Sequence, residues 1–370
     1  MRRTANEIDF WRGFALVVIF INHIPGFPFE NFTHRNYGYS DSAELFVFLA
    51  GWALRLLASG AAGPHGLMRL VLRLVARAVT LYAAQILITM LAIAVIAGFA
   101  LWFDNPLLLE WHNAAAVFQE PVRAHVGLVL LTHQLGYFDI LPLYVVLMGG
   151  APLIAVVHRL APHALLPLSL ALYLCALAFR LDLPTWPVEG VWFFNPFAWQ
   201  LVFVLGFVLA GRDGAGGWAR RNLVWLRPAG TAFVLLCVVL AIYNWEPDPT
   251  RMPEPKLFFI VDKGHMTPLK LVHFLLLAAA CAGSFRWIGR AARPLARFLS
   301  MLGRNSLNVF CVGSLLSLIA QFVRVASAGS FGVDLCVLVI GIAVLGITAW
   351  LSELRDRLRG PVARSAPVST

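Results

Sequence analysis

Long runs of hydrophobic residues, separated by short polar segments, recur along the whole chain. A helix needs about 20 apolar residues to cross the hydrocarbon core of a bilayer. By this criterion we expect ten transmembrane helices, and an even number places both ends of the chain on the same side. The predicted spans are residues 10–25, 43–58, 79–101, 140–157, 164–179, 194–210, 229–244, 268–285, 305–323 and 332–351.

The composition supports an integral membrane protein. Of the 370 residues, 60% are hydrophobic and only 13% are charged, which is about half the charged share of a soluble domain. Too few charges are present to cover a soluble core, so a soluble enzyme and a disordered chain are excluded. We therefore expect an all-α, polytopic fold. Residues 1–355 should form a single transmembrane domain, and residues 356–370 a disordered cytoplasmic tail.

The net charge of +10 agrees with the expected topology. If both termini are cytoplasmic, 21 Lys and Arg residues lie inside and 8 outside, whereas 5 acidic residues lie inside and 14 outside. This asymmetry follows the positive-inside rule, so the basic excess does not call for a nucleic-acid partner. The five cysteines lie in or beside apolar runs without a CxxC pair. We interpret them as packing residues, and we expect no metal site.

Four segments between the spans are long enough to carry function or to act as linkers. Residues 26–42, 102–139 and 245–267 are expected outside, and the stretch 122–136 has the periodicity of an interfacial helix. The inside segment 211–227 contains GRDGAGG. Its glycines favour a flexible linker.

The first apolar run places two ionisable residues on one helical face. Arg12 and His23, in the segment IDFWRGFALVVIFINHIPG, are eleven residues apart. This separation is about 20° more than three full turns and spans about 16 Å along the axis. Ionisable residues inside a membrane are costly and are candidates for a functional site. Alternatively, Arg12 is an anchor paired with Asp9, and His23 bonds a loop carbonyl.

The segment RNYGYSDSAELFVFLAG, residues 35–51, carries two acids at the start of the second span. Asp41 followed three residues later by Glu44 has the spacing of a helix capping box. A functional role is compatible with capping. Either carboxylate could orient a histidine general base at the outer mouth, with Arg35 close by.

Three arginines and a histidine complete the candidates from the residues alone. Arg69, Arg73 and Arg77 are spaced four apart, so they share one side of a helix at the cytoplasmic face. Such a stripe can bind lipid headgroups or the phosphates of a phosphorylated donor. His273 lies in the apolar run KLVHFLLLA, where an interhelical hydrogen bond is its simplest role.

The sequence resembles a known family. The Arg-x10-His pattern of the first helix resembles the acyltransferase-3 membrane acyltransferases, and the chain is most similar to the OpgC branch, named for succinylation of osmoregulated periplasmic glucans. Characteristic segments occur in order along nearly the whole chain. They are residues 8–26, residues 35–51, YFDILPLYVVLM (137–148), FNPFAWQLVFVLG (194–206), DKGHMTPLKLVHFLLLA (262–278) and GRNSLNVFCVGSLLSL (303–318).

The resemblance implies a ten-helix enzyme of the bacterial inner membrane. It would move an acyl group, succinyl in this branch, from cytoplasmic acyl-CoA to a hydroxyl of an extracytoplasmic glycan. His23 would be the essential histidine, assisted by Glu44 or Asp41, and Arg69, Arg73 and Arg77 would face the CoA phosphates. Acyl-CoA would be a substrate, with no permanently bound cofactor, and membrane lipids would surround the protein. The residues expected to bind substrate are Arg12, Arg35, Asn36, Asp139 and His273.

A transporter or flippase of a glycan or lipid-linked substrate is the main alternative. It would also need many spans and buried polar groups. Transporters often show repeat symmetry between halves and helices broken at mid-membrane. We detect no internal repeat in the sequence, although Pro142, Pro152, Pro167 and Pro196 could break helices.

Overall fold

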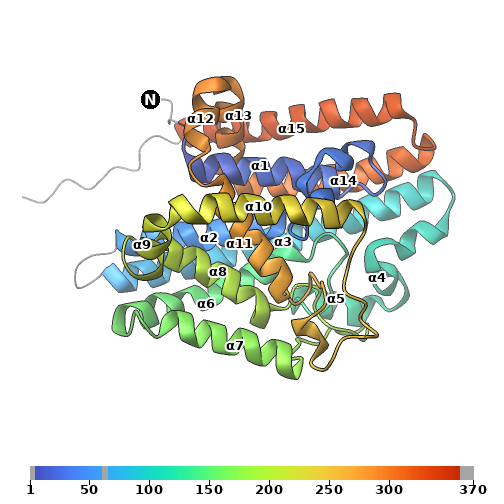
Figure 1. Ribbon diagram of the computed structural model, residues 1–370. Helices are drawn as coiled ribbons and strands as arrows, with labels where there is room; N and C mark the ends of the chain where they lie inside the picture. Colours follow the sequence, from blue (N-terminus) through green and yellow to red (C-terminus); the bar gives the residue numbers. More distant parts are fainter. Residues whose placement is uncertain (1–4, 61–65, 359–370) are drawn as a thin grey trace, which may run out of the picture. The chain divides into compact units, whose positions relative to one another are not determined.

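The structure is a computed structural model that describes residues 5–60 and 66–358 (Figure 1). Within these ranges the fold is helical and contains no strand, only an isolated antiparallel bridge between Pro184 and Val191. The chain divides into two compact units. Unit 1 comprises Met1–Pro28 and Phe285–Thr370, and unit 2 comprises Phe29–Ser284.

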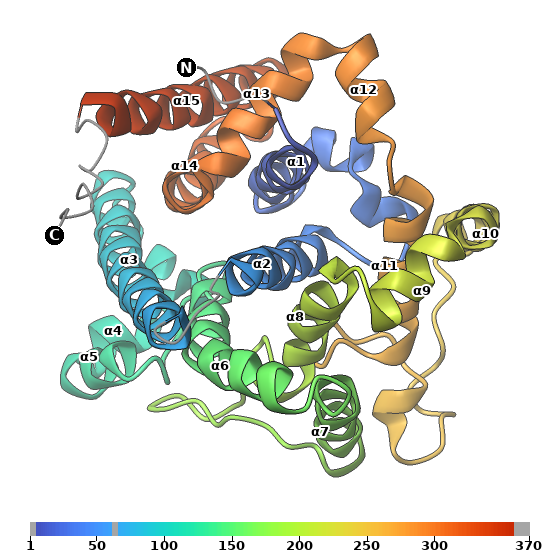
Figure 2. The same cartoon turned by 90° about the vertical axis from the view of Figure 1, so that its left-hand side faces the viewer.

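Unit 1 is built from the first helix and the last four. These are α1 (Glu7–Asn22), α12 (Phe285–Ala291), α13 (Arg293–Arg304), α14 (Ser306–Ala326) and α15 (Phe331–Leu358). Helix α1 packs against α13 and α14, and both of these contact α15 (Figure 2). The crossing of α1 and α13 depends on two glycines. A Cβ on Gly13 would collide with the carbonyl of Leu299, and a Cβ on Gly303 with that of Asp9.

Unit 2 contains the remaining ten α-helices of the described chain. They are α2 (Ser42–Ser59), α3 (Gly66–Trp102), α4 (Ala115–Gln119), α5 (Pro121–Val129), α6 (Ile140–Leu160), α7 (Leu165–Phe179), α8 (Pro196–Ala210), α9 (Gly214–Arg221), α10 (Leu223–Ile242) and α11 (Pro268–Cys281). Short 3-10 helices are η1 (Pro28–Phe32), η2 (His34–Tyr37), η3 (Pro106–Asn113) and η4 (Lys256–Phe258). The main packed pairs are α2 with α8, α3 with α6, α7 with α8 and α10 with α11.

Helices α2 and α8 are in backbone contact at a pair of glycines. A Cβ on Gly51 of α2 would collide with the carbonyl oxygen of Phe203, and a Cβ on Gly206 of α8 would collide with that of Phe48. Small residues let membrane helices approach this closely and gain packing energy where lipid supplies no hydrophobic drive. The side chains around this crossing form the centre of unit 2, where Trp199, Phe203 and Phe207 are fully buried.

The apolar helices agree with a multi-pass membrane protein. Among the described residues, six helices are long and apolar enough to cross a bilayer: α2, α3, α6, α10, α14 and α15. The total rises to eight if the bent pairs α8–α9 (70°) and α11–α12 (50°) each count as one span. Each of the ten predicted segments overlaps a helix. The number ten is not confirmed, because α1 has only 16 residues and α7 only 15.

Two connecting segments differ from expectation. The predicted linker 211–227 is instead mostly helical, since it contains α9 and the start of α10, so that prediction is wrong. The predicted interfacial helix forms over Pro121–Val129 and ends before residue 136. At the C-terminus, α15 runs through Leu358, so residues 356–358 of the expected tail are helical. Residues 359–370 lie outside the described residues. The single domain over 1–355 stays a prediction.

Candidate functional site

The N-terminus of α2 is a complete capping box. The Asp41 side chain accepts a hydrogen bond from the backbone N–H of Ala43 at 2.8 Å, and Glu44 Oε2 accepts one from the Asp41 N–H at 2.9 Å. The predicted capping role of both acids is therefore confirmed. Both carboxyl groups are buried, which is costly for a charge unless a cation is nearby.

Two lysines from a distant part of the chain supply that compensation. Lys263 Nζ lies 2.5 Å from Asp41 Oδ2, and Lys270 Nζ lies 3.3 Å from Glu44 Oε1. Burial alone would raise the pKa of Asp41, but the charge of Lys263 and the bond to the capping box hold this pKa well below its usual range. Burial likewise opposes the charge on Lys263, yet Asp41 and Glu44 raise its pKa. We call Asp41, Glu44, Lys263 and Lys270 the charged cluster.

A serine–histidine pair lies beside the charged cluster. Ser40 Oγ and His273 Nδ1 are 2.8 Å apart, and both side chains are buried. Lys270, one helical turn before His273, donates to the backbone carbonyl of Tyr39. In the described part of the chain, His273 Nε2 has no hydrogen-bond partner, and an added Cβ on Gly38 would lie 2.5 Å from it. His273 thus joins α11 to the segment that enters α2.

A second histidine links the loop before α11 to the entrance of α8. His265 lies between two carboxylates, with Nδ1 2.8 Å from Asp262 Oδ1 and Nε2 2.9 Å from Asp182 Oδ1. The hydrogen bond to Asp262 is the main reason that the pKa of His265 is raised. Asn195, the N-cap of α8, donates to Asp182 at 2.6 Å. These bonds hold the loop carrying Lys263 in place.

Three of the expected substrate-binding residues of unit 2 lie around this cluster: Arg35, Asp139 and His273. Arg35 and Asn36 are exposed on η2, and the charge of Arg35 reaches Lys263. Asp139 is half-buried at the start of α6, and burial raises its pKa to about 6 in spite of the nearby charge of Lys263. The structure therefore brings Arg35, Asp139 and the charged cluster into one electrostatic neighbourhood.

His23 and Arg12 belong to unit 1. His23 is half-buried and is the C-cap of α1, with its backbone N–H donating to Ile19 O at 3.0 Å. Its carbonyl accepts from Gln321 Nε2 at 2.7 Å, and the carbonyl of Pro25 accepts from Arg324 Nη1 at 2.5 Å. Arg324 also binds the buried Asp334 at 2.6 Å. Because His23 is in unit 1, its pairing with Glu44 or Asp41 stays a prediction.

The arginine stripe lies on the first turns of α3. Arg69, Arg73 and Arg77 are all exposed, beside the buried Leu70, Leu74 and Leu81 of the same helix. With 37 residues, α3 is about 55 Å long, well beyond the roughly 30 Å of a bilayer core. The stripe can therefore lie outside the apolar part of the helix.

Sequence reasoning missed several residues of this site. It did not single out Lys263, Lys270, His265 or Ser40, although three of them lie in the characteristic segment 262–278. A signal was present, because a lysine at the start of an apolar helix needs an anionic partner. Over residues 5–60 and 66–358, no group of three or more His, Cys, Asp or Glu side chains could hold a metal ion.

Comparison with known protein families gives a match. The model of the family described as OpgC protein matches residues 3–357, nearly the whole chain. No curated protein and no solved structure matches the chain significantly. The wider acyltransferase-3 placement stays a resemblance. The family match implies a membrane acyltransferase that acts on glucans. Since it extends over nearly all of the sequence, we conclude that this chain belongs to the OpgC protein family.

Proposed function

We propose that this chain is an acyl-CoA-dependent O-acyltransferase of the bacterial inner membrane. It moves an acyl group, succinyl in the first instance, from cytoplasmic acyl-CoA to a hydroxyl of an extracytoplasmic glycan. The observation that carries this proposal is the family match over residues 3–357. The six to eight helices of the described chain that are apolar and long enough to span a bilayer support it. In the proposed topology both termini are cytoplasmic, as the distribution of basic residues indicates.

His23 is the proposed general base. A neutral imidazole can accept a hydroxyl proton near neutral pH. As the proton moves to His23, the glycan oxygen forms a bond to the thioester carbonyl carbon and the carbon–sulfur bond breaks. The CoA thiolate takes up a proton from water on the donor side to become the thiol, and the imidazolium gives the hydroxyl proton to water on the acceptor side, so no net proton is gained or lost. The bonds that Gln321 and Arg324 donate to the backbone carbonyls of His23 and Pro25 support this role, because they hold the chain at and just after His23 in place within unit 1.

The acids of α2 have a supporting role in this proposal. Glu44 is the first choice and Asp41 the second for the carboxylate that fixes the tautomer of His23 and stabilises the imidazolium. Within unit 2 both acids are already bound by lysines. Either acid would therefore orient His23 while it stays paired with its lysine.

Substrate contacts are assigned to polar residues in each unit. Arg35 is exposed and makes no hydrogen bond with another described residue. Its guanidinium can therefore bind the free carboxylate of a succinyl group. Asn36, Asp139 and His273 would contact glycan hydroxyls. In unit 1, Arg12 would bind substrate from the helical face that it shares with His23.

The donor approaches from the other face of the membrane. We propose that Arg69, Arg73 and Arg77 attract the phosphates of acyl-CoA to the cytoplasmic face. Their exposure on α3 supports this, since exposed like charges raise the local concentration of an anionic ligand.

The test is transfer of labelled succinyl from succinyl-CoA to a glucan acceptor by purified protein in nanodiscs. His23→Gln should still fold and bind CoA but should lose transfer by about two or more orders of magnitude. His163→Gln is the matched control, because His163 is exposed between α6 and α7. Near-full transfer by His23→Gln would refute the mechanism and make His273 the next histidine to test. Transport of unmodified glycan without acyl transfer would support the flippase alternative.

A further inference from the structure

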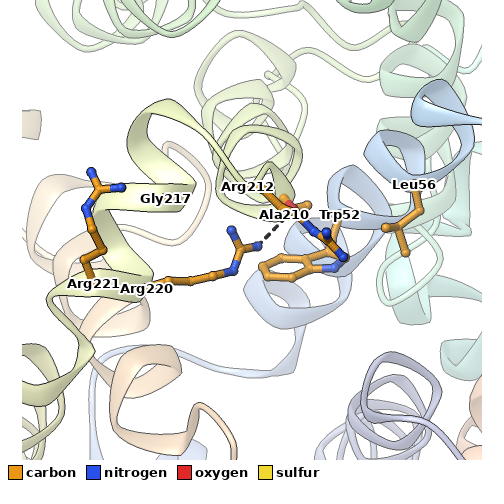
Figure 3. A pocket seen from close by; sticks show the side chains of 7 residues that line it. All are labelled: Trp52, Leu56, Ala210, Arg212, Gly217, Arg220 and Arg221. Carbon is orange, nitrogen blue, oxygen red and sulfur yellow. Dashed lines mark hydrogen bonds between the residues drawn. The ribbon is translucent and has the colours of Figure 1, made fainter.

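A basic pocket lies in unit 2 where α8 ends and the chain folds back into α9. Its volume is about 580 Å³, within the range of small-molecule sites. The side chains that line it include Trp52 and Leu56 of α2 and three arginines, Arg212, Arg220 and Arg221 (Figure 3). None of the described residues that line the pocket is acidic.

The glycines of the GAGG sequence create this pocket. A Cβ on Gly217 would lie 2.5 Å from the carbonyl oxygen of Arg212, and a Cβ on Gly216 would lie 2.7 Å from that of Leu209. Only glycine lets α9 pack this closely on the end of α8, from which it is bent by 70°. The fold-back brings Arg220 and Arg221 to the same place as Arg212.

Arg220 has a structural task in the pocket. Its guanidinium donates to the carbonyls of Gly211, Ala210 (3.0 Å) and Leu209 (3.3 Å), which are the last acceptors of α8. These carbonyls form the negative end of the helix dipole. Arg220 covers them with positive charge, so the helix end does not repel an anion.

Arg212 and Arg221 remain available for a ligand. Both are exposed, and neither makes a hydrogen bond or ion pair with another described residue. Figure 3 shows the guanidinium groups of Arg212 and Arg220 beside the Trp52 ring, whereas Arg221 lines the pocket further along α9, with its guanidinium apart from the other two. An arginine fork matches the oxygens of a phosphate group, and the Trp52 face offers a flat apolar wall.

We propose that this pocket binds the phosphate groups of the acyl donor, with Arg212 and Arg221 as the contacting residues. This inference rests on the proposed acyl-CoA chemistry and adds the place where the donor is held. The pocket and the charged cluster lie toward opposite ends of α2: Glu44 is in its first turn, and Trp52 is about 12 Å further along the axis. A donor anchored here would direct its acyl end along α2 toward the cluster.

The ligand chemistry could also be that of an anionic lipid headgroup, so the experiment separates the two sources. Purified protein is placed in nanodiscs of phosphatidylcholine, which has no net charge, and titrated with CoA and with inorganic pyrophosphate by calorimetry. A second set of nanodiscs contains phosphatidylglycerol, whose retention by the protein is measured by native mass spectrometry. The variants are Arg212→Gln/Arg221→Gln and, independently, Leu56→Glu, which adds a carboxylate at an exposed position of the pocket wall.

We expect each pocket variant to weaken CoA and pyrophosphate binding by about tenfold or more, since each lost charge-assisted bond is worth roughly a factor of ten. The matched control, Arg251→Gln, changes an exposed arginine of the 245–267 loop and should bind like the unchanged protein. Equal affinity in all proteins would overturn the proposal. Loss of phosphatidylglycerol retention in the pocket variants, without any CoA or pyrophosphate binding by the unchanged protein, would also overturn it and identify a lipid site.

Succinyl transfer distinguishes failure of this site from failure of the proposed function. If the double variant transfers succinyl with an unchanged KM for succinyl-CoA, the pocket assignment fails and the function stands. If the unchanged protein binds CoA through Arg212 and Arg221 but transfers nothing, the pocket assignment stands and the proposed reaction fails.

Discussion

Lys270 reaches Glu44 across 3.3 Å, and only 8% of the lysine side chain and none of the glutamate side chain is exposed. The two residues lie more than 200 positions apart in the sequence, so this ion pair ties α11 to the first turn of α2. Burying two charges is costly, and their attraction compensates only while both are present. The pair therefore specifies the arrangement of the helices more than it adds to stability.

This relationship predicts a strong coupling between two substitutions. Lys270→Met or Glu44→Gln alone should destabilise the protein by about 3–5 kcal/mol, because one buried group is left without its partner. The double variant should recover most of that loss. Thermal unfolding in detergent, followed by tryptophan fluorescence, measures the effect. Additive losses in the double variant would contradict the account.

His265 predicts a dependence of stability on pH. Its pKa is raised by Asp262 and then by Asp182, so its contribution is complete below the ordinary histidine pKa of 6.5 and is lost as pH rises through the higher folded-state value. For Asp262, burial is outweighed by His265 and the pKa is lowered. The stabilisation from ionised Asp262 is fully present above pH 3.8. It is lost as pH falls through the lower pKa that Asp262 has in the folded protein.

The measurement is the unfolding temperature in detergent between pH 5 and pH 9. We expect a decline toward alkaline pH in the unchanged protein and a much flatter profile in His265→Gln. His163→Gln, which changes an exposed histidine, should retain the decline. If the unfolding temperature of His265→Gln falls with pH as steeply as that of the unchanged protein, His265 is not the source of the pH dependence.

The glycine pair between α2 and α8 predicts a steric effect. Gly206→Val should push α8 away from the Phe48 carbonyl and destabilise unit 2 by about 1–3 kcal/mol or more. Gly98→Val in α3 is the matched control, because nothing lies within 4 Å of a Cβ at that position. Equal unfolding temperatures for the two variants would show that α2 and α8 can move apart at their crossing without loss of stability.

The stripe on α3 predicts a dependence on salt. In the triple variant Arg69→Gln/Arg73→Gln/Arg77→Gln, kcat/KM for succinyl-CoA should fall at low ionic strength and approach the unchanged value at about 1 M salt, where the Debye length is about 3 Å. The turnover number kcat should stay the same. A loss that persists at high salt would indicate direct contact with the donor rather than long-range attraction.

Local patterns were readable from the sequence, and distant partnerships were not. The apolar runs predicted the positions of the helices because each helix must be apolar over most of its length. The capping box was visible because Asp41 and Glu44 are only three residues apart. Nothing in that segment indicated which cations would face the acids, since Lys263 and Lys270 come from another part of the chain.

The segment 211–227 shows why the remaining error arose. Glycine lowers helix propensity by about 1 kcal/mol per residue, so GRDGAGG favoured a linker. In the fold, the same glycines are needed for a helix that touches its neighbour's backbone, and packing outweighs propensity. The pocket beside α9 therefore cannot be predicted from the pattern of this segment.

The backbone contact between α2 and α8 has a consequence for motion during turnover. At Gly51 and Gly206 the backbones of α2 and α8 are in contact without side chains between them, so we expect the two helices to move together. The charged cluster lies at the N-terminus of α2, and residues of the C-terminal half of α2 line the basic pocket. We therefore expect the distance between the charged cluster and the pocket to stay constant during turnover. For a donor held in the pocket, the distance from its phosphates to the charged cluster would be fixed, which favours an acyl group of one length over longer or shorter ones.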